Sequence, residues 1–148
     1  MKKNDFMSEA LKEAQKAFDQ NEVPIGAIIV ENDKIIARAH NSNLTNKDPS
    51  AHAEIVALRQ AALARNSSRL DSCDIYVTLE PCAMCAAAIS LARIRRVYYA
   101  AADEKFGAVE NGVRFFQSAS CFHVPEVYSE ISQKESVKIL QDFFQRKR

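Results

Sequence analysis

Residues 74–92 read DIYVTLEPCAMCAAAISLA, and this stretch predicts how the chain is organised. Its first part, 74–79, is a short run of apolar and β-branched side chains, which is typical of a buried strand. Pro81 ends that strand, and the helix-forming run 82–92 follows at once and is apolar on every side. A buried strand that leads directly into a buried helix favours an α/β fold.

The flanking segments predict further helices and strands that alternate along the chain. They are a helix over about 5–20, strands at 23–30 and 34–40 that form an antiparallel hairpin, a helix at 51–65 begun by the capping oxygens of 48–50, strands at 96–100 and 126–131, and a C-terminal helix opened by a capping box at 132–135. This order predicts a mixed sheet of about five strands, covered by helices on both faces.

Length and composition limit the classes of protein that remain. With 148 residues, 47% hydrophobic and 26% charged, the chain fits one compact domain over residues 1–148. Because no apolar run approaches the roughly 18 residues of a membrane span, and residues 1–8 do not resemble a signal sequence, we expect a cytoplasmic protein without a membrane anchor. A net charge of +1 excludes a global basic field, so any contact with RNA must come from local patches.

Two short motifs contain the residue types of a catalytic zinc site. Such a site takes three protein ligands and leaves a fourth position for water. His52, Cys82 and Cys85 supply three ligands, and the two cysteines share one side of a helix whose N-terminus favours thiolates. Glu54 lies beside His52 in the first turn of its helix and is expected to act as a base. The sequence thus predicts a site over two helix N-termini.

Each motif alone has a simpler interpretation. A Cys-x-x-Cys pair also occurs in structural zinc sites and in redox proteins, although a redox protein would leave residues 52–54 unexplained. A non-catalytic, zinc-stabilised RNA-binding module stays open, with the fourth position closed by Cys73, Cys121 or another histidine. The simplest expectation for the remaining cysteines and histidines is an ordinary structural role outside the metal site: Cys73, Cys121, His40 and His123.

Together, the stretches 52–54 and 81–85 match the signature of zinc-dependent nucleobase deaminases. The chain also closely resembles the bacterial tRNA adenosine deaminases, which convert the wobble adenosine of an arginine tRNA to inosine. This resemblance covers nearly the whole chain. Its matching segments are 22–27, Asn41, 48–54, 78–85 and 142–144 with Arg146.

The resemblance implies a cytidine deaminase-like, three-layer α/β/α fold, one zinc ion per subunit, a homodimer, and a tRNA anticodon stem-loop as substrate. It implies that water activated by the zinc attacks C6 of adenine while Glu54 moves the protons. It also implies the following contacts: Asn41, Glu54 and the backbone of Ala53 hydrogen-bond the purine, Ile25 and His52 pack on its faces, and Asp103, Lys105, Phe143, Phe144 and Arg146 contact neighbouring nucleotides.

Some features leave alternatives open. Phe106 stands where the family has a smaller polar residue, and 110–116 is a variant stretch. A deaminase of free cytosine, guanine or a nucleoside would share the metal motif, because specificity depends on the shape of the pocket. Without the resemblance, Phe143 and Phe144 would be read as helix packing, and residues 146–148 as a solvated tail.

Overall fold

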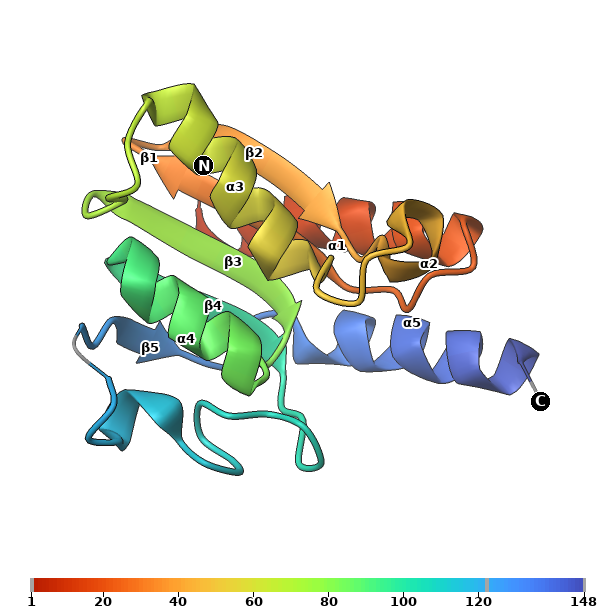
Figure 1. Ribbon diagram of the computed structural model, residues 1–148. Coiled ribbons are helices and arrows are strands. Elements are labelled where there is room, and N and C mark those ends of the chain that lie inside the picture. Colours follow the sequence, from red (N-terminus) through yellow and green to blue (C-terminus); the bar gives the residue numbers. More distant parts are fainter. Residues whose placement is uncertain (1, 122, 148) are drawn as a thin grey trace.

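The computed structural model describes residues 2–121 and 123–147, and its centre is a five-stranded sheet in the order β2-β1-β3-β4-β5 (Figure 1). β1 pairs antiparallel with β2 and β3, while the pairs β3–β4 and β4–β5 are parallel. The predicted mixed sheet of five strands is therefore confirmed. The strands are β1 (Gly26–Glu31), β2 (Lys34–His40), β3 (Cys73–Leu79), β4 (Arg96–Ala101) and β5 (Glu126–Tyr128).

Helices cover both faces of this sheet. In Figure 1, α3 and α4 lie in front of the sheet and α1 lies behind it. α5 packs beside α1 and against β4, which confirms the three-layer α/β/α fold. The helices are α1 (Lys3–Asp19), α2 (Asn43–Asn46), α3 (Ala53–Arg65), α4 (Ala83–Ala92) and α5 (Gln133–Arg146), and a 3-10 turn spans Phe115–Gln117. In the described part of the chain, no helix has both the length and the apolar character needed to cross a membrane.

The burial of β3 explains its uninterrupted apolar run. Ile75 and Val77 point into the cluster beneath α3 and α4, whereas Tyr76 points into the cluster beneath α1. The Tyr76 ring stacks on Tyr98 of β4 at 4.3 Å, and Tyr98 stacks on Tyr128 of β5 at 5.0 Å. This aromatic row crosses the parallel half of the sheet and stabilises its register.

The α1 helix can approach β1 closely because the strand begins with a glycine. A Cβ at Gly26 would lie 2.0 Å from the carbonyl oxygen of Ala10 in α1. The amide of Gly26 also donates to the Thr78 hydroxyl at 3.1 Å, which joins the start of β1 to the end of β3. The end of β3 is thereby fixed, and the metal motif follows it directly.

Several predicted boundaries were wrong. Residues 23–25 precede β1 instead of belonging to it, and the last strand ends at Tyr128 instead of residue 131. The capping box at 132–135 does not form, because Ser132 has φ +58° and its side chain makes no capping hydrogen bond. A capping serine needs an extended backbone to reach the amides of the first turn.

The two helices that carry the metal motifs also differ from expectation. α3 begins at Ala53, not at residue 51, and the Asp48 carboxylate accepts hydrogen bonds from the Ser50 amide and hydroxyl instead of capping the helix. α4 is not buried on every side, since Met84 is 39% exposed and Leu91 is 63% exposed. Its outward face is partly exposed, whereas its inward face packs on the sheet.

Candidate active site

The candidate site lies where the N-termini of α3 and α4 meet beside the end of β3. His52 is the N-cap residue of α3 and Cys82 is the N-cap residue of α4, so both precede the first helical turn. The chain reaches His52 from the end of β2 and reaches Cys82 from the end of β3. Because β3 and β4 are parallel, this edge collects loops at their carboxyl ends, where ligand sites of open α/β sheets form.

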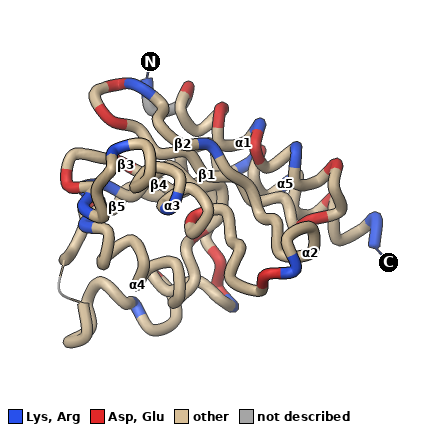
Figure 2. Tube along the Cα trace, turned by 45° about the horizontal axis from the view of Figure 1, so that its top comes forward, with Lys and Arg blue, Asp and Glu red and all other residues tan. Residues whose placement is uncertain are grey.

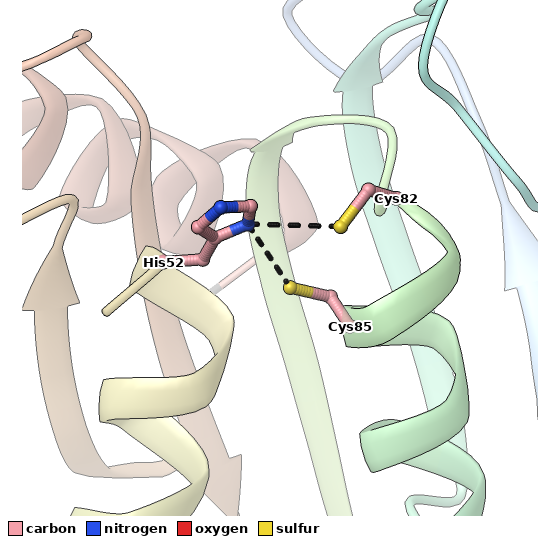
Figure 3. Close-up of side chains that lie close together, drawn as sticks. All are labelled: His52, Cys82 and Cys85. Atoms are coloured by element: carbon pink, nitrogen blue, oxygen red, sulfur yellow. Dashed lines mark hydrogen bonds between the residues drawn. The ribbon is translucent and has the colours of Figure 1, made fainter. Parts of the chain in front are cut away.

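His52, Cys82 and Cys85 point toward one another across the gap between the two helices (Figure 3). The Nδ1 atom of His52 lies 3.6 Å from the Cys82 sulfur and 3.5 Å from the Cys85 sulfur. A tetrahedral zinc ion with ordinary Zn–S and Zn–N bonds would separate such a nitrogen and sulfur by about 3.6 Å. The three donors are thus spaced as zinc ligands, and they are the one group of this kind among the described residues.

The titration of these groups fits a site that holds a cation. Hydrogen bonding from Cys85, together with that from His52, lowers the pKa of Cys82 to about 4. The hydrogen bond to Cys82 and burial raise the pKa of Cys85. The hydrogen bond to Cys82 also raises the pKa of His52. The site therefore carries one thiolate readily, and a second thiolate this close requires a cation between the two.

Glu54 lies in the first turn of α3, and only 4% of its surface is exposed. Burial, reinforced by the nearby Cys82 thiolate, raises the pKa of Glu54 to about 7. A carboxyl group with that pKa exchanges a proton easily at neutral pH, which suits a general acid and base. Glu54 also borders the cavity described below, so a bound molecule can reach it.

Asn41 fixes the start of α3. Its side-chain oxygen accepts a hydrogen bond from the Ala53 amide at 2.8 Å, which satisfies a free donor of the first turn. This bond occupies the N–H of Ala53, whose backbone was expected to bind the purine, and a purine contact by the Ala53 backbone stays a prediction. The Asn41 amide nitrogen is a further hydrogen-bond donor, and Asn41 also lines the cavity.

A cavity of about 1200 Å³ opens beside the three donors. Its volume exceeds the few hundred Å³ that a single small ligand fills, so the cavity has room for a larger ligand. The wall is formed by α2, the loop after β3, the loop after β4 and the end of α5, with residues that include Ile25, Asn41, Leu44, His52, Glu54, Glu80, Cys82, Asp103, Lys105, Phe106, Phe143 and Phe144.

The residues expected to contact neighbouring nucleotides differ in accessibility. Phe143 is only 2% exposed and packs edge-on against Phe18, whereas Phe144 is 50% exposed. Arg146 donates to the Phe18 carbonyl at 3.2 Å, which ties the end of α5 to α1. Lys105 is exposed. Nucleotide contacts by this group remain a proposal, and Arg148 lies outside the described residues.

Glu80 received no role from the sequence, although it borders the same cavity. It is 3% exposed, and its carboxylate accepts hydrogen bonds from the amides of Asp103, Val109, Glu110 and Asn111 and from the Asn111 side chain. These bonds outweigh the opposing effect of burial and lower the pKa of Glu80. A carboxylate between a buried strand and Pro81 was the only signal that could have identified this anchor.

Comparison with known proteins agrees with the site. A family model for MafB19-like deaminases matches residues 1–148. The tRNA-specific adenosine deaminase of Agrobacterium fabrum is 54% identical over 143 residues, which is 97% of this chain and 94% of that protein.

Solved structures of deaminases also resemble this chain. One from studies of A-to-I editing by tRNA:A34 deaminases at the wobble position of transfer RNA shares 53% identity with a TM-score of 0.92, and the match covers 93% of this chain and 100% of that one. A guanine deaminase from Bacillus subtilis shares 33% identity with a TM-score of 0.67, over 80% of this chain and 87% of that one. With identity above 50% over nearly its full length, the chain belongs to the bacterial tRNA-specific adenosine deaminase family and is a deaminase.

Proposed function

We propose that the protein hydrolyses the 6-amino group of the wobble adenosine in the anticodon loop of an arginine tRNA, which yields inosine and ammonia. The observation that carries this proposal is the position of Glu54, a buried carboxyl group beside the His52, Cys82 and Cys85 cluster and at the wall of a large cavity. The high identity to tRNA-specific adenosine deaminases supports the choice of substrate.

The donor set and its spacing fit one zinc ion per subunit, held by His52, Cys82 and Cys85. When bound, zinc supplies a Lewis acid that polarises water. Glu54 accepts a proton from the attacking water and delivers it to N1 of adenine as the oxygen adds to C6. Glu54 next moves the proton of the added hydroxyl to the 6-amino group, which leaves as ammonia when the C6–N bond breaks, so one water molecule is consumed and one ammonia molecule is released.

The other walls of the cavity would orient the base. We propose that the Asn41 side-chain amide donates to the purine and that Ile25 and the His52 ring pack on its two faces. Asp103, Lys105, Phe144 and Arg146, with the edge of Phe143, would contact neighbouring nucleotides. An anticodon loop suits this arrangement because its unpaired bases leave the stack at low cost. We further propose a cytoplasmic homodimer whose subunits are single deaminase domains.

The positions of the other cysteines favour a catalytic zinc site over a purely structural one. Closing the fourth position would need another ligand, and Cys73 lies at the opposite end of β3 beside Arg65. Cys121 contacts the Ser90 hydroxyl, also away from the cluster. Within the described chain, no fourth His, Cys or carboxylate ligand joins the three donors, which supports a site whose fourth ligand is water.

A substrate panel tests the proposal. Purified zinc-loaded protein is incubated with an arginine anticodon stem-loop, free adenosine, guanine and cytosine, and the products are identified by mass spectrometry. We expect inosine at the wobble position of the stem-loop and no turnover of the free compounds. Turnover of guanine or cytosine without any reaction of the stem-loop would replace the substrate by a free base.

A further inference from the structure

Phe106 is an exposed aromatic residue at the mouth of the cavity. Its side chain is 67% exposed, yet it lines the same cavity as Glu54. The ammonium group of Lys105 lies 5.2 Å from the centre of its ring. Exposed aromatic rings beside a cation are the elements with which proteins bind single-stranded nucleic acids, since the ring stacks on a base and the cation pairs with phosphate.

The backbone that carries Phe106 is held firmly from the N-terminal side. The Asp103 carboxylate accepts hydrogen bonds from the Lys105 amide at 3.1 Å and from the Phe106 amide at 3.0 Å. The Gly107 amide donates to the Asp103 carbonyl at 2.9 Å. These three bonds close a tight turn, so the ring is presented on a defined backbone rather than on a loose loop.

The following residues join the same turn to the metal motif. Gly107 forms a β-bridge with Cys82, and the Ala108 amide donates to the Pro81 carbonyl at 2.9 Å. A Cβ at Gly107 would lie 2.4 Å from the Asp103 carbonyl oxygen and 2.6 Å from the Glu80 carboxyl carbon, so only glycine permits this approach. Backbone contacts therefore hold the turn directly beside the segment that carries Cys82.

Charge alone does not explain how an RNA loop would be held here. The net charge is only +1, and Figure 2 shows Lys and Arg interspersed with Asp and Glu along the chain. Affinity must therefore come from a few local contacts. A ring carried on a fixed backbone loses only side-chain entropy when a base stacks on it, which makes it an efficient contact.

We propose that Phe106 is a stacking platform for a base adjacent to the target adenosine and thereby helps to select an RNA loop over a free nucleoside. This inference rests on the proposed function and adds a specificity residue to it. Lys105 would pair with the phosphate of the stacked nucleotide. The target base itself would lie deeper in the cavity, beside Glu54.

The test compares wild-type protein with Phe106→Ala, Phe106→Tyr and Leu63→Ala. Leu63 is 83% exposed on α3 and does not line the cavity, so its variant controls for loss of an exposed apolar side chain. Inosine formation is measured on three anticodon stem-loops: an intact one, one abasic on the 5′ side of the wobble adenosine, and one abasic on the 3′ side.

We expect Phe106→Ala to lower kcat/KM on the intact stem-loop by roughly 5- to 150-fold, while Phe106→Tyr and Leu63→Ala stay close to wild type. With wild-type protein, kcat/KM on one of the two abasic stem-loops should fall by a similar factor relative to the intact stem-loop. With Phe106→Ala, kcat/KM on that abasic stem-loop should equal the value on the intact one, because the missing base and the missing ring belong to the same stacking pair. Equal kcat/KM for Phe106→Ala and wild type, or independent losses on both abasic loops, would overturn the inference while leaving the proposed function intact. A wild-type protein inactive on the intact loop would overturn both.

Discussion

At the residue scale, the side-chain oxygen and the side-chain nitrogen of Asn41 have separate roles, one observed and one proposed, which can be tested separately. Its oxygen caps α3 at the Ala53 amide, and its nitrogen is the proposed donor to the purine. The capping bond supports the backbone on either side of Ala53, which carries His52 and Glu54. Asn41 therefore contributes both to the stability of the fold and to the geometry of the site.

Two variants separate these contributions. Asn41→Ala removes the acceptor, so we expect the free energy of unfolding to fall by about 1 to 2 kcal/mol in urea denaturation. Asn41→Asp keeps an acceptor at a helix N-terminus and should retain most of that stability, yet it should deaminate poorly because it lacks the amide donor. An Asn41→Asp protein with full activity would remove the purine contact from the proposal.

At the element scale, Glu22 joins the connection between α1 and β1 to helix α2. Its carboxylate accepts hydrogen bonds from the Leu44 amide, the Thr45 amide and the Thr45 hydroxyl. Burial opposes ionisation, but these bonds outweigh it and hold the pKa of Glu22 below its ordinary value. Glu22 therefore stabilises the fold above the unfolded-state pKa of about 4.3, and this contribution is lost as pH falls through the folded-state pKa.

We expect Glu22→Gln to be less stable than wild type by about 1 to 2 kcal/mol at pH 7. The difference should shrink as the pH falls from the unfolded-state pKa of about 4.3 through the lower folded-state pKa, because folded wild-type Glu22 then becomes neutral as well. Urea denaturation of both proteins at pH 7, 5 and 3.5 measures this, with Glu104→Gln as a control at an exposed carboxylate. A difference that stays constant over this range would contradict the assignment to ionised Glu22.

Local signals account for the elements that the sequence predicted well. The β-branched runs of β1 and β2 and the turn at Asn32 and Asp33, which both have positive φ, are encoded by neighbouring residues. The start of α3 could not be predicted because its capping oxygen belongs to Asn41, twelve residues before Ala53. The box at 132–135 failed because its residue types do not determine the φ of Ser132.

In the candidate site, too, features encoded by neighbouring residues could be predicted, whereas features that depend on distant residues could not. The three candidate metal donors and Glu54 follow recognisable spacing, and their position over two helix N-termini agrees with the sequence prediction. The role of Glu80 could not be predicted, since its hydrogen-bond donors come from residues 103–111 and meet it only in the folded chain. The burial of Phe143 against Phe18 likewise depends on the packing of α5 beside α1.

At the scale of the whole molecule, the outward face of α4 supports the proposed homodimer. Met84 and Leu91 leave an apolar surface exposed on a helix whose other face lies in the core. Exposed apolar patches of this kind commonly mark contacts between subunits. Because α4 also carries Cys85, an interface there would lie next to the metal donors.

We expect Leu91→Glu to shift the protein from dimer to monomer in sedimentation velocity, because a charge in the interface would be buried without a partner. Leu63→Glu, at an exposed apolar position on α3, is the matched control and should stay dimeric. A Leu91→Glu protein that stays dimeric, or a wild-type protein that is itself a monomer, would show that the α4 face is not a subunit interface.

The central claim is that Glu54 moves the protons at a metal site formed by His52, Cys82 and Cys85. The most direct test measures inosine formation in the anticodon stem-loop together with zinc content for wild type, Glu54→Gln and Cys85→Ala. We predict about one zinc per subunit in Glu54→Gln with a rate at least roughly 100-fold below wild type, and loss of zinc in Cys85→Ala. A zinc-loaded Glu54→Gln protein that forms inosine at the wild-type rate would contradict the account.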